Sequence, residues 1–210
     1  MRSRSTRKKV VLATSNPGKV REIRRCLQGL PLELVSLRDI QATAEVEEKG
    51  RTFLENARLK SLAYSRLSDH LTLAEDSGLE VDALDGAPGV FSARFSDPRA
   101  TDEKNIRKVL RLMKGVPRPR RGAQFVCQLV LSQGGRMLKT CRGQVRGVIA
   151  EGKKGDHGFG YDPIFFYRPF GRTFGELRPD LKNAVSHRGR ALKKMRTFLL
   201  RYLGTSEKGT

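Results

Sequence analysis

The sequence predicts an α/β fold, and three observations indicate it. Near the N-terminus, a β-branched apolar run leads into a turn-rich segment and then into apolar residues at helical spacing, which is a strand–loop–helix unit. The second half of the chain is instead rich in short strand patterns. The length of 210 residues suits one large domain or one domain in two lobes, with ample chain to bury a core. We expect one domain.

Apolar periodicity and turn residues delimit the elements of the first half. In order, these are a strand at 9–14, a helix after residue 19, a strand at 32–36, a helix at 52–67, a short strand at 71–74, an extended segment at 79–83 and a helix at 101–113. Thr52 and Glu55 form the T-x-x-E pattern of a capping box, which satisfies exposed N–H groups at a helix start. Asp102 and Glu103 lie where a helix dipole favours anions.

The Pro- and Arg-rich segment 114–122 separates the two halves and is interpreted as a loop between lobes. The elements expected after it are strands at 123–131, 136–142, 144–149 and 163–167 and a helix at 189–203. The apolar residues of that last helix recur at spacings of three and four, which indicates a core stripe. Residues 1–8 predict a disordered basic arm and residues 204–210 a disordered tail, so a single two-lobed domain is expected over 9–203.

The net charge of +20 is the strongest compositional signal. It indicates polyanionic partners, either nucleic acid or a highly charged small substrate, and does not choose between them. A solvated basic surface is the ordinary explanation of the basic clusters. Because the chain has no helix-turn-helix, zinc-finger or RNP-like motif, nucleic acid is not the partner we expect.

Cysteine and histidine usage narrows the kinds of metal site. The three cysteines are widely spaced without a CxxC pair, which predicts small core residues rather than a disulfide framework or a zinc site. The three histidines lack HxxxH or HExxH spacing, so carboxylates must hold any metal. No long apolar run and no signal region occur, and we expect a cytoplasmic protein without a membrane span.

The segment TSNPGK, residues 14–19, joins the end of a strand to the start of a helix. Free N–H groups and the positive end of the helix dipole make such a junction an anion site. It is not a Walker A loop, because an upstream glycine is missing and Val20 rather than a hydroxyl residue follows Lys19. A plain turn with a surface lysine explains the segment about as well.

Glu75 and Asp76 follow an apolar strand, beside Ser77, in the place where open α/β sheets present ligands. A second acidic segment, residues 45–48, lies in the preceding long connection. The two segments together could hold one Mg²⁺ through oxygen ligands. Adjacent carboxylates in a solvated turn are the ordinary alternative.

Two further segments have a composition that suits a nucleotide. Residues 155–163 place three glycines among two aromatic residues, so that a backbone can approach a ligand closely and an aromatic ring can stack on a base. Lys182, His187, Arg188 and Arg190 gather around the start of the last helix and suit a triphosphate. A surface basic cluster explains these cations equally simply.

Taken together, these segments resemble the inosine/xanthosine triphosphate pyrophosphatases, also called Ham1 or RdgB-like proteins. The resemblance rests on VVLATSNPGKVREI, TFLENARLKS, AEDSGLEVDALDGAPGVFSARFS, GFGYDPIFF and KNAVSHRGRALKKM. Five ordered motifs between about residues 9 and 203 are far more specific than any one of them. The resemblance implies an elongated mixed β-sheet flanked by helices, two lobes with a central active-site cleft, and a homodimer.

The resemblance also implies roles for individual residues. Asp76 and Lys19 match catalytic residues, Asp76 as proton acceptor, and Glu48 and Asp76 match magnesium ligands. The residues that match substrate contacts are Thr14, Ser15, Asn16, Pro17, Gly18, Lys19, Ser77, Phe159, Gly160, Tyr161, Asp162, Lys182, His187 and Arg188. Glu75 would be a supporting acid. Ser15 departs from the glycine that many relatives carry.

The implied activity is Mg²⁺-dependent hydrolysis of ITP, dITP and XTP to the monophosphate and pyrophosphate, which removes non-standard purine nucleotides from the nucleotide pool. Two alternatives remain open. One is a house-cleaning pyrophosphatase for other modified nucleotides, and the other is a basic nucleic-acid-binding protein.

Overall fold

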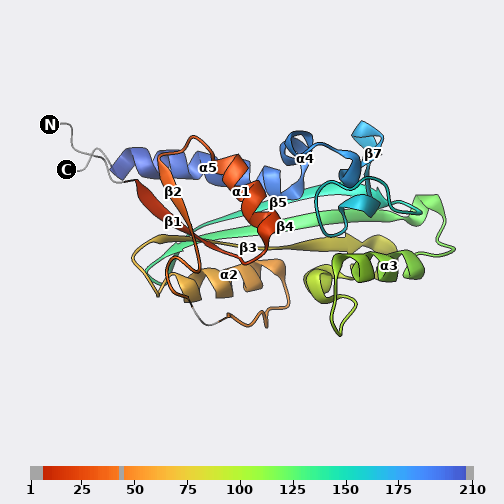
Figure 1. Cartoon of the computed structure of the whole chain (residues 1–210), viewed down its shortest axis with the longest axis horizontal. Coiled ribbons are helices and arrows are strands. Elements are labelled where there is room, and N and C mark those ends of the chain that lie inside the picture. Colours follow the sequence, from red (N-terminus) through yellow and green to blue (C-terminus); the bar gives the residue numbers. More distant parts are fainter. Residues whose placement is uncertain (1–6, 43–44, 207–210) are drawn as a thin grey trace. The chain divides into compact units, whose positions relative to one another are not determined.

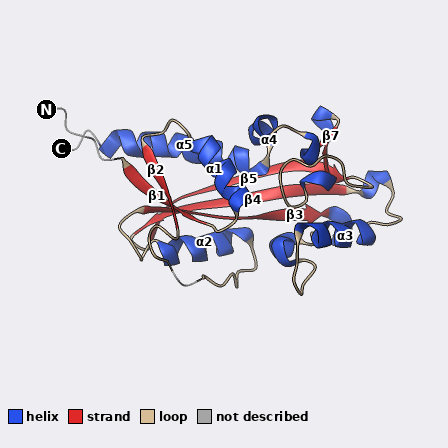
Figure 2. Ribbon diagram, viewed as in Figure 1, coloured by secondary structure: helices blue, strands red, loops and turns tan. Residues whose placement is uncertain are grey.

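A computed structural model describes residues 7–42 and 45–206 of the chain. Its seven strands form one sheet in the order β2-β1-β3-β4-β5-β6-β7 (Figure 2). The strands are β1 (Lys8–Ala13), β2 (Leu32–Ser36), β3 (Leu71–Val81), β4 (Gly122–Gln133), β5 (Arg136–Ile149), β6 (Phe165–Tyr167) and β7 (Arg172–Thr173). β1 is parallel to β2 and β3, whereas β6 is antiparallel to β5 and β7. The predicted α/β class and mixed sheet are confirmed.

The chain divides into two compact units. The first comprises residues 1–76, 128–141 and 192–210, and the second comprises residues 77–127 and 142–191. Each of the long strands β3, β4 and β5 contributes residues to both units. The segment 114–122, predicted as a loop between lobes, lies wholly inside the second unit, and that prediction is wrong. It joins the helix Asp102–Leu112 to the first part of β4, which belongs to the same unit, and its Pro- and Arg-rich composition does not distinguish this role from a loop between lobes.

Helices cover both faces of the sheet in each unit (Figure 1). The helices are α1 (Pro17–Leu27), α2 (Phe53–Tyr64), α3 (Asp102–Leu112), α4 (Pro179–Val185) and α5 (His187–Ser206). In the first unit, α2 lies on one face and α5 on the other. Arg196 of α5 donates to the carbonyl oxygens of Cys26 and Gln28 at the end of α1, which ties these two helices together.

Local hydrogen bonds set the starts of three helices. Asn16, Thr52 and Thr101 are N-caps whose side chains accept from the backbone N–H three residues on, at 3.0, 3.2 and 3.2 Å. The predicted capping box at Thr52 is modified, because Glu55 accepts from the N–H of Arg51 rather than from that of the cap residue. The sequence patterns located the cap at Thr52 and the helix start at Thr101 correctly, whereas the cap at Asn16 was not predicted.

Strand lengths differ from the prediction in two places. β3 runs without a break through Glu75, Asp76 and Ser77, where a turn was expected, and β5 runs through Gly143, where two strands were expected. Pairing with neighbouring strands outweighs the low strand propensity of such residues. At Gly143, a Cβ atom would lie 2.0 Å from the carbonyl oxygen of His187, so the strand needs glycine for this close approach.

Further differences concern the C-terminal half. The structure adds β7 and α4, two short elements that the sequence patterns did not predict. The last helix continues to Ser206, beyond the predicted end at residue 203, and residues 207–210 of the predicted tail lie outside the described residues. At the other end, β1 begins at Lys8, and residues 1–6 of the predicted arm are likewise outside them. The single two-lobed domain stays a prediction.

The cysteines form no disulfide. Cys127 and Cys141 are buried, as predicted for small core residues, and burial raises the pKa of the Cys141 thiol. Cys26 is half-buried at the end of α1, so the prediction of a core position is wrong for this residue.

An ion pair joins the segment after β3 to β5 in the second unit. Arg146 donates to both carboxylate oxygens of Asp82, at 3.0 and 2.5 Å, and holds the pKa of Asp82 below its usual value. Because the folded-state pKa is the lower one, the pair contributes stability above the unfolded pKa of about 4. This contribution is lost as the pH falls through the folded pKa.

Replacing Arg146 with Gln is therefore expected to lower the free energy of unfolding at pH 7. The loss should be below about 1 kcal/mol, because both side chains are half-exposed and water screens the pair. Urea titrations at pH 7 and at pH 3 or lower measure it, with exposed Arg136→Gln on the same strand as the control. A deficit that persists undiminished at low pH would assign the effect to packing instead.

Candidate active site

The loop after β1, predicted as an anion site, leads directly into the start of α1. The Thr14 hydroxyl accepts from the N–H of Asn16 at 3.2 Å, and the Asn16 side chain caps α1. Pro17 occupies the first helical turn, where its missing N–H costs no hydrogen bond. Gly18 is buried, and Lys19 places its Nζ 3.5 Å from the buried Glu75 carboxylate. The predicted loop 14–19 thus begins α1 and is connected to β3 through Lys19.

The register of β1 against β3 explains where the acids lie. The parallel pairing ends at Ala13 opposite Ala74, so Glu75 and Asp76 come directly after the last residue that β1 pairs. Both carboxylates are almost fully buried, at 1% and 6% exposure. The prediction that these acids follow the end of their own strand is wrong, because β3 continues through both of them to Val81. They lie instead beside the carboxyl end of the neighbouring strand β1.

Burial raises the pKa of Asp76, since a charged carboxylate is less stable away from water. The cations Lys60 and Lys19 oppose this shift, and the nearby Glu48 carboxylate adds to it. Glu48 and Asp76 are therefore close enough to interact electrostatically, as expected of two carboxylates that share one metal ion. The raised pKa makes Asp76 a better proton acceptor than an exposed aspartate.

Two residues of α2 complete this cluster, and sequence reasoning missed both. Asn56 donates from Nδ2 to Asp76 Oδ2 at 3.1 Å, while its Oδ1 accepts from the N–H of Gly50 at 2.7 Å. Lys60 Nζ lies 2.5 Å from Glu48 Oε1. Spacing by four residues puts Asn56 and Lys60 on one helix face. A pair of polar residues at this spacing, among apolar residues, was the sequence signal that could have indicated their role.

The loop that bears Glu48 is held to α2 on both sides of that residue. The N–H of Val46 donates to the Tyr64 hydroxyl at 3.2 Å, and the N–H of Gly50 donates to Asn56. These bonds fix the loop backbone, so that Glu48 can face Lys60. We call the six residues Lys19, Glu48, Asn56, Lys60, Glu75 and Asp76 the carboxylate cluster; all belong to the first unit.

The second unit holds an aromatic–cation cluster, which we define as Ser77, Phe159, Asp162, Lys182 and Arg188. Lys182 Nζ lies 2.5 Å from Asp162 Oδ2, and both side chains are more than nine-tenths buried. The Lys182 ammonium is 4.7 Å and the Arg188 guanidinium 5.3 Å from the centre of the Phe159 ring. Arg188 also donates to the Ser77 hydroxyl at 3.0 Å.

The glycines around Phe159 permit this arrangement. A Cβ atom at Gly158 would lie 2.0 Å from Asp162 Oδ2, and the residue has a φ of +80°. Asp162 can therefore accept from the N–H of Phe159, at 2.8 Å. The N–H of Gly160 donates to Asp102 Oδ2 at 2.7 Å. These contacts hold the half-buried Phe159 ring in place.

Two of the residues predicted to contact substrate, Tyr161 and His187, have side chains that pack in the core. The Tyr161 hydroxyl donates to the carbonyl oxygen of Ser92 at 2.8 Å, and burial raises the pKa of that hydroxyl. The His187 ring stacks on Phe125, with centroids 4.6 Å apart, and is 4% exposed. Both side chains support the cluster from the interior, and their contact with substrate stays a prediction.

The donor set of the carboxylate cluster fits a magnesium ion bound together with a phosphate. In the described part of the chain, no group of three or more His, Cys, Asp or Glu side chains could hold a metal ion. Mg²⁺ commonly binds through one or two protein carboxylates and takes its other ligands from substrate phosphates and water. Glu48 and Asp76 supply such a pair.

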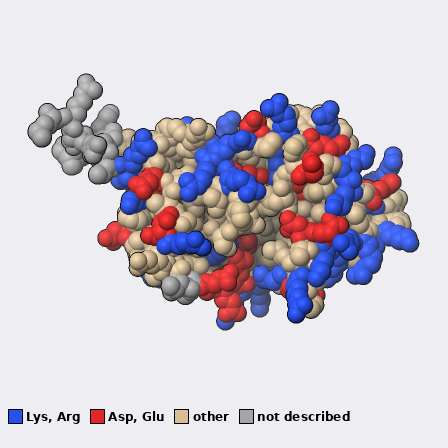
Figure 3. Space-filling view, viewed as in Figure 1, with Lys and Arg blue, Asp and Glu red and all other residues tan. Residues whose placement is uncertain are grey.

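The surface is basic without being uniform. On the face drawn in Figure 3, Lys and Arg side chains form several groups, with Asp and Glu between them. On that face, the distribution suits general attraction of anions more than one continuous nucleic-acid track. None of the described helices is both long enough and apolar enough to cross a membrane.

Comparison with known proteins agrees with this geometry. The family model described as "Ham1 family" matches residues 10–198. A "dITP/XTP pyrophosphatase" of Desulforamulus reducens is 46% identical over 193 residues, 92% of this chain and 96% of its own length. One of Geobacter sulfurreducens, with the same description, is 48% identical over 191 residues, 91% and 96% of the two lengths.

Solved structures have the same fold. A HAM1 protein from Coxiella burnetii superposes with a TM-score of 0.85 at 38% identity, over 92% of this chain and 99% of that one. The Ham1 protein of Staphylococcus aureus gives a TM-score of 0.84 at 37% identity, over 93% and 100%. Because the family model matches residues 10–198, which is most of the chain, the chain belongs to the Ham1 family.

Proposed function

We propose that this protein is a Mg²⁺-dependent nucleoside triphosphate pyrophosphatase that hydrolyses ITP, dITP and XTP to the monophosphate and pyrophosphate. The observation that carries the proposal is the buried Asp76 beside Glu48, Lys60 and Lys19, at the end of β1 and the start of α1. The names of the relatives, dITP/XTP pyrophosphatases at 46–48% identity, support the same activity. A homodimer is proposed from the family resemblance alone, and the cytoplasmic location expected from the sequence stays a prediction.

The reaction joins water to the α-phosphorus and breaks its bond to the oxygen that bridges to the β-phosphorus. Asp76 accepts a proton from the attacking water, and pyrophosphate leaves with the bridging oxygen. Lys19 and Lys60 offset the charge that builds up on the phosphate oxygens. In the loop 14–19, phosphate is bound by the N–H groups of Ser15 and Gly18, since those of Asn16 and Lys19 donate within the loop. When bound to Glu48 and Asp76, Mg²⁺ would supply further positive charge to those oxygens.

Base recognition is assigned to the aromatic–cation cluster. Phe159 offers a ring face for stacking, which every base tolerates. Lys182 and Arg188 are buried donors, suited to a purine with a 6-oxo group and mismatched with the 6-amino group of adenine. The cluster thus favours 6-oxo purines over adenine through hydrogen bonding.

A substrate panel tests the proposal. Pyrophosphate release is measured from ITP, XTP, dITP, ATP, GTP and dTTP, with Mg²⁺ and with EDTA. The expected result is metal-dependent release that favours ITP, dITP and XTP by about 100-fold over ATP and GTP. Preference for a modified pyrimidine or methylated nucleotide in an extended panel would favour the alternative house-cleaning activity, and no turnover at all would remove the proposal.

Replacing Phe159 with Ala is expected to raise KM for every purine substrate by a similar factor, about tenfold, with little change in kcat. The reason is that stacking on the ring contributes to binding and is independent of the base. Steady-state kinetics with ITP and XTP measures the effect. Phe170→Ala, which truncates an exposed phenylalanine of the same unit, is the control. A change confined to kcat would contradict the stacking role.

A further inference from the structure

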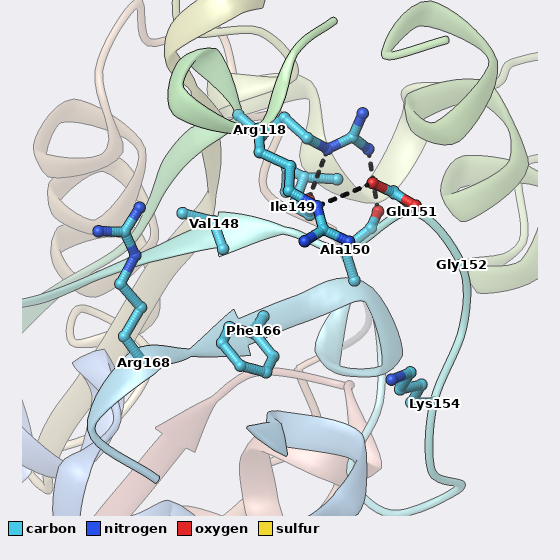
Figure 4. A pocket seen from close by; sticks show the side chains of 10 residues that line it. Arg118, Val148, Ile149, Ala150, Glu151, Gly152, Lys154, Phe166 and Arg168 are labelled. Atoms are coloured by element: carbon cyan, nitrogen blue, oxygen red, sulfur yellow. Dashed lines mark hydrogen bonds and ion pairs between the residues drawn. The ribbon is translucent and has the colours of Figure 1, made fainter. Parts of the chain in front are cut away.

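The second unit contains a pocket of about 390 Å³ at the carboxyl end of β5 (Figure 4). Its lining residues come from the 114–122 segment, from β5 and the loop after it, and from the region of β6. They are Arg118, Arg121, Val148, Ile149, Ala150, Glu151, Gly152, Lys154, Phe166 and Arg168. None of them belongs to the carboxylate or aromatic–cation cluster, so the proposed function leaves this pocket unexplained.

One wall of the pocket contains a buried positive charge. Arg121 is 6% exposed and donates to the carbonyl oxygens of Met113, Val116, Ile149 and Ala150, at 2.8 to 3.3 Å. These hydrogen bonds fix the guanidinium but do not neutralise it, because carbonyl oxygens carry only partial charge. The charge therefore contributes to a positive potential in the pocket.

Three exposed cations add to this potential. Arg118, Lys154 and Arg168 line the pocket, and the one acidic lining residue, Glu151, pairs with Arg118 at 3.3 Å. Figure 4 shows Arg168 and Lys154 on opposite sides of Phe166, with Arg118 and Glu151 across from them. Four basic side chains against one acidic side chain make the pocket suitable for an anion.

The pocket also has an apolar wall. Val148 and Phe166 are direct cross-strand neighbours on β5 and β6, and both are half-buried. Side chains at such opposed positions point to the same face of the sheet, so they form a continuous surface. An aromatic ring between cations is a favourable surface for a planar group that carries a phosphate.

We propose that this pocket is a second ligand site, which binds an organic phosphate with an aromatic ring, such as a nucleoside monophosphate. The ring lies on Phe166 and Val148, and the phosphate is bound by Lys154, Arg168 and Arg118. Arg121 fixes the pocket wall and adds charge without contacting the ligand. The volume is within the range of small-molecule sites. Arg118 and Arg121 of the basic segment 114–122 thereby gain a specific role.

The test is a titration of the full chain with AMP, whose 6-amino group the proposed catalytic site disfavours. Backbone amide NMR signals of residues 148–152 and 166–168 report binding at the pocket, and calorimetry gives the affinity. Lys154→Gln/Arg168→Gln is expected to weaken AMP binding about tenfold. Arg111→Gln/Lys114→Gln, which removes the same charge from exposed positions outside the pocket, should leave the affinity within about twofold.

Two single variants sharpen the result. Phe166→Leu should weaken AMP binding about tenfold while inorganic phosphate binding stays unchanged. Glu151→Gln should strengthen AMP binding, because it frees Arg118. Equal weakening by both double variants would reduce the effect to general attraction by the net charge. Any one of three outcomes would overturn the proposal: this equal weakening, a lack of NMR shifts at residues 148–152, or equal affinity for AMP and inorganic phosphate.

Discussion

Replacing Asp76 with Asn is expected to lower kcat by about 100-fold or more, with much smaller changes in KM. The amide cannot accept the proton of the attacking water and is a poorer oxygen ligand for a divalent cation. Misfolding is not the expected cause, because asparagine fills the same space and keeps an oxygen that can accept from Asn56. Initial rates of pyrophosphate release from ITP at saturating Mg²⁺ measure the effect.

The matched control is Asp69→Asn, which removes an exposed carboxylate from the same unit. Its kcat should remain within about twofold of wild type, since a surface charge contributes little to a transition state that it does not contact. Near-normal turnover in Asp76→Asn would remove Asp76 from the chemistry. Rescue of Asp76→Asn by a higher Mg²⁺ concentration alone would assign the carboxylate to metal binding and not to proton transfer.

Replacing Asp162 with Asn is expected to lower the free energy of unfolding by about 3–5 kcal/mol. The change removes the carboxylate that pairs with the buried Lys182 ammonium, and an ammonium is costly to bury beside a neutral group. For a chain of this length, the midpoint of thermal unfolding should fall by about 10 °C. Differential scanning calorimetry measures the shift, and urea titration gives the free energy.

Two variants separate the ion pair from its surroundings. Glu33→Gln breaks an exposed pair with Lys9 and should leave the thermal midpoint nearly unchanged. Asp162→Asn/Lys182→Met removes both charges and should recover part of the stability that the single variant loses. If the double variant is as unstable as the single one, the loss arises from the hydrogen bond between Phe159 and Asp162 and not from the buried charge.

The sequence by itself determined features that depend on neighbouring residues. The helix starts at Thr52 and Thr101, the strand β2 and the α/β class follow from turn chemistry, apolar periodicity and short-range hydrogen bonds. The five motifs also identified the family. Their order along the chain can be recognised without knowing which residues are in contact in the folded protein. Lys19, Glu48 and Asp76 were found in this way, and the structure brings them into one cluster.

Only the tertiary structure decided which residues meet across long chain separations. Strand pairing made β3 continuous through Glu75 and Asp76, and packing brought Asn56 to Asp76 and turned the Tyr161 hydroxyl toward Ser92. The pairing of Lys182 with Asp162, 20 residues apart, arises in the same way. Burial and partner choice depend on the whole folded chain, so local propensity does not contain them. The buried charges of the site are therefore a property of the fold.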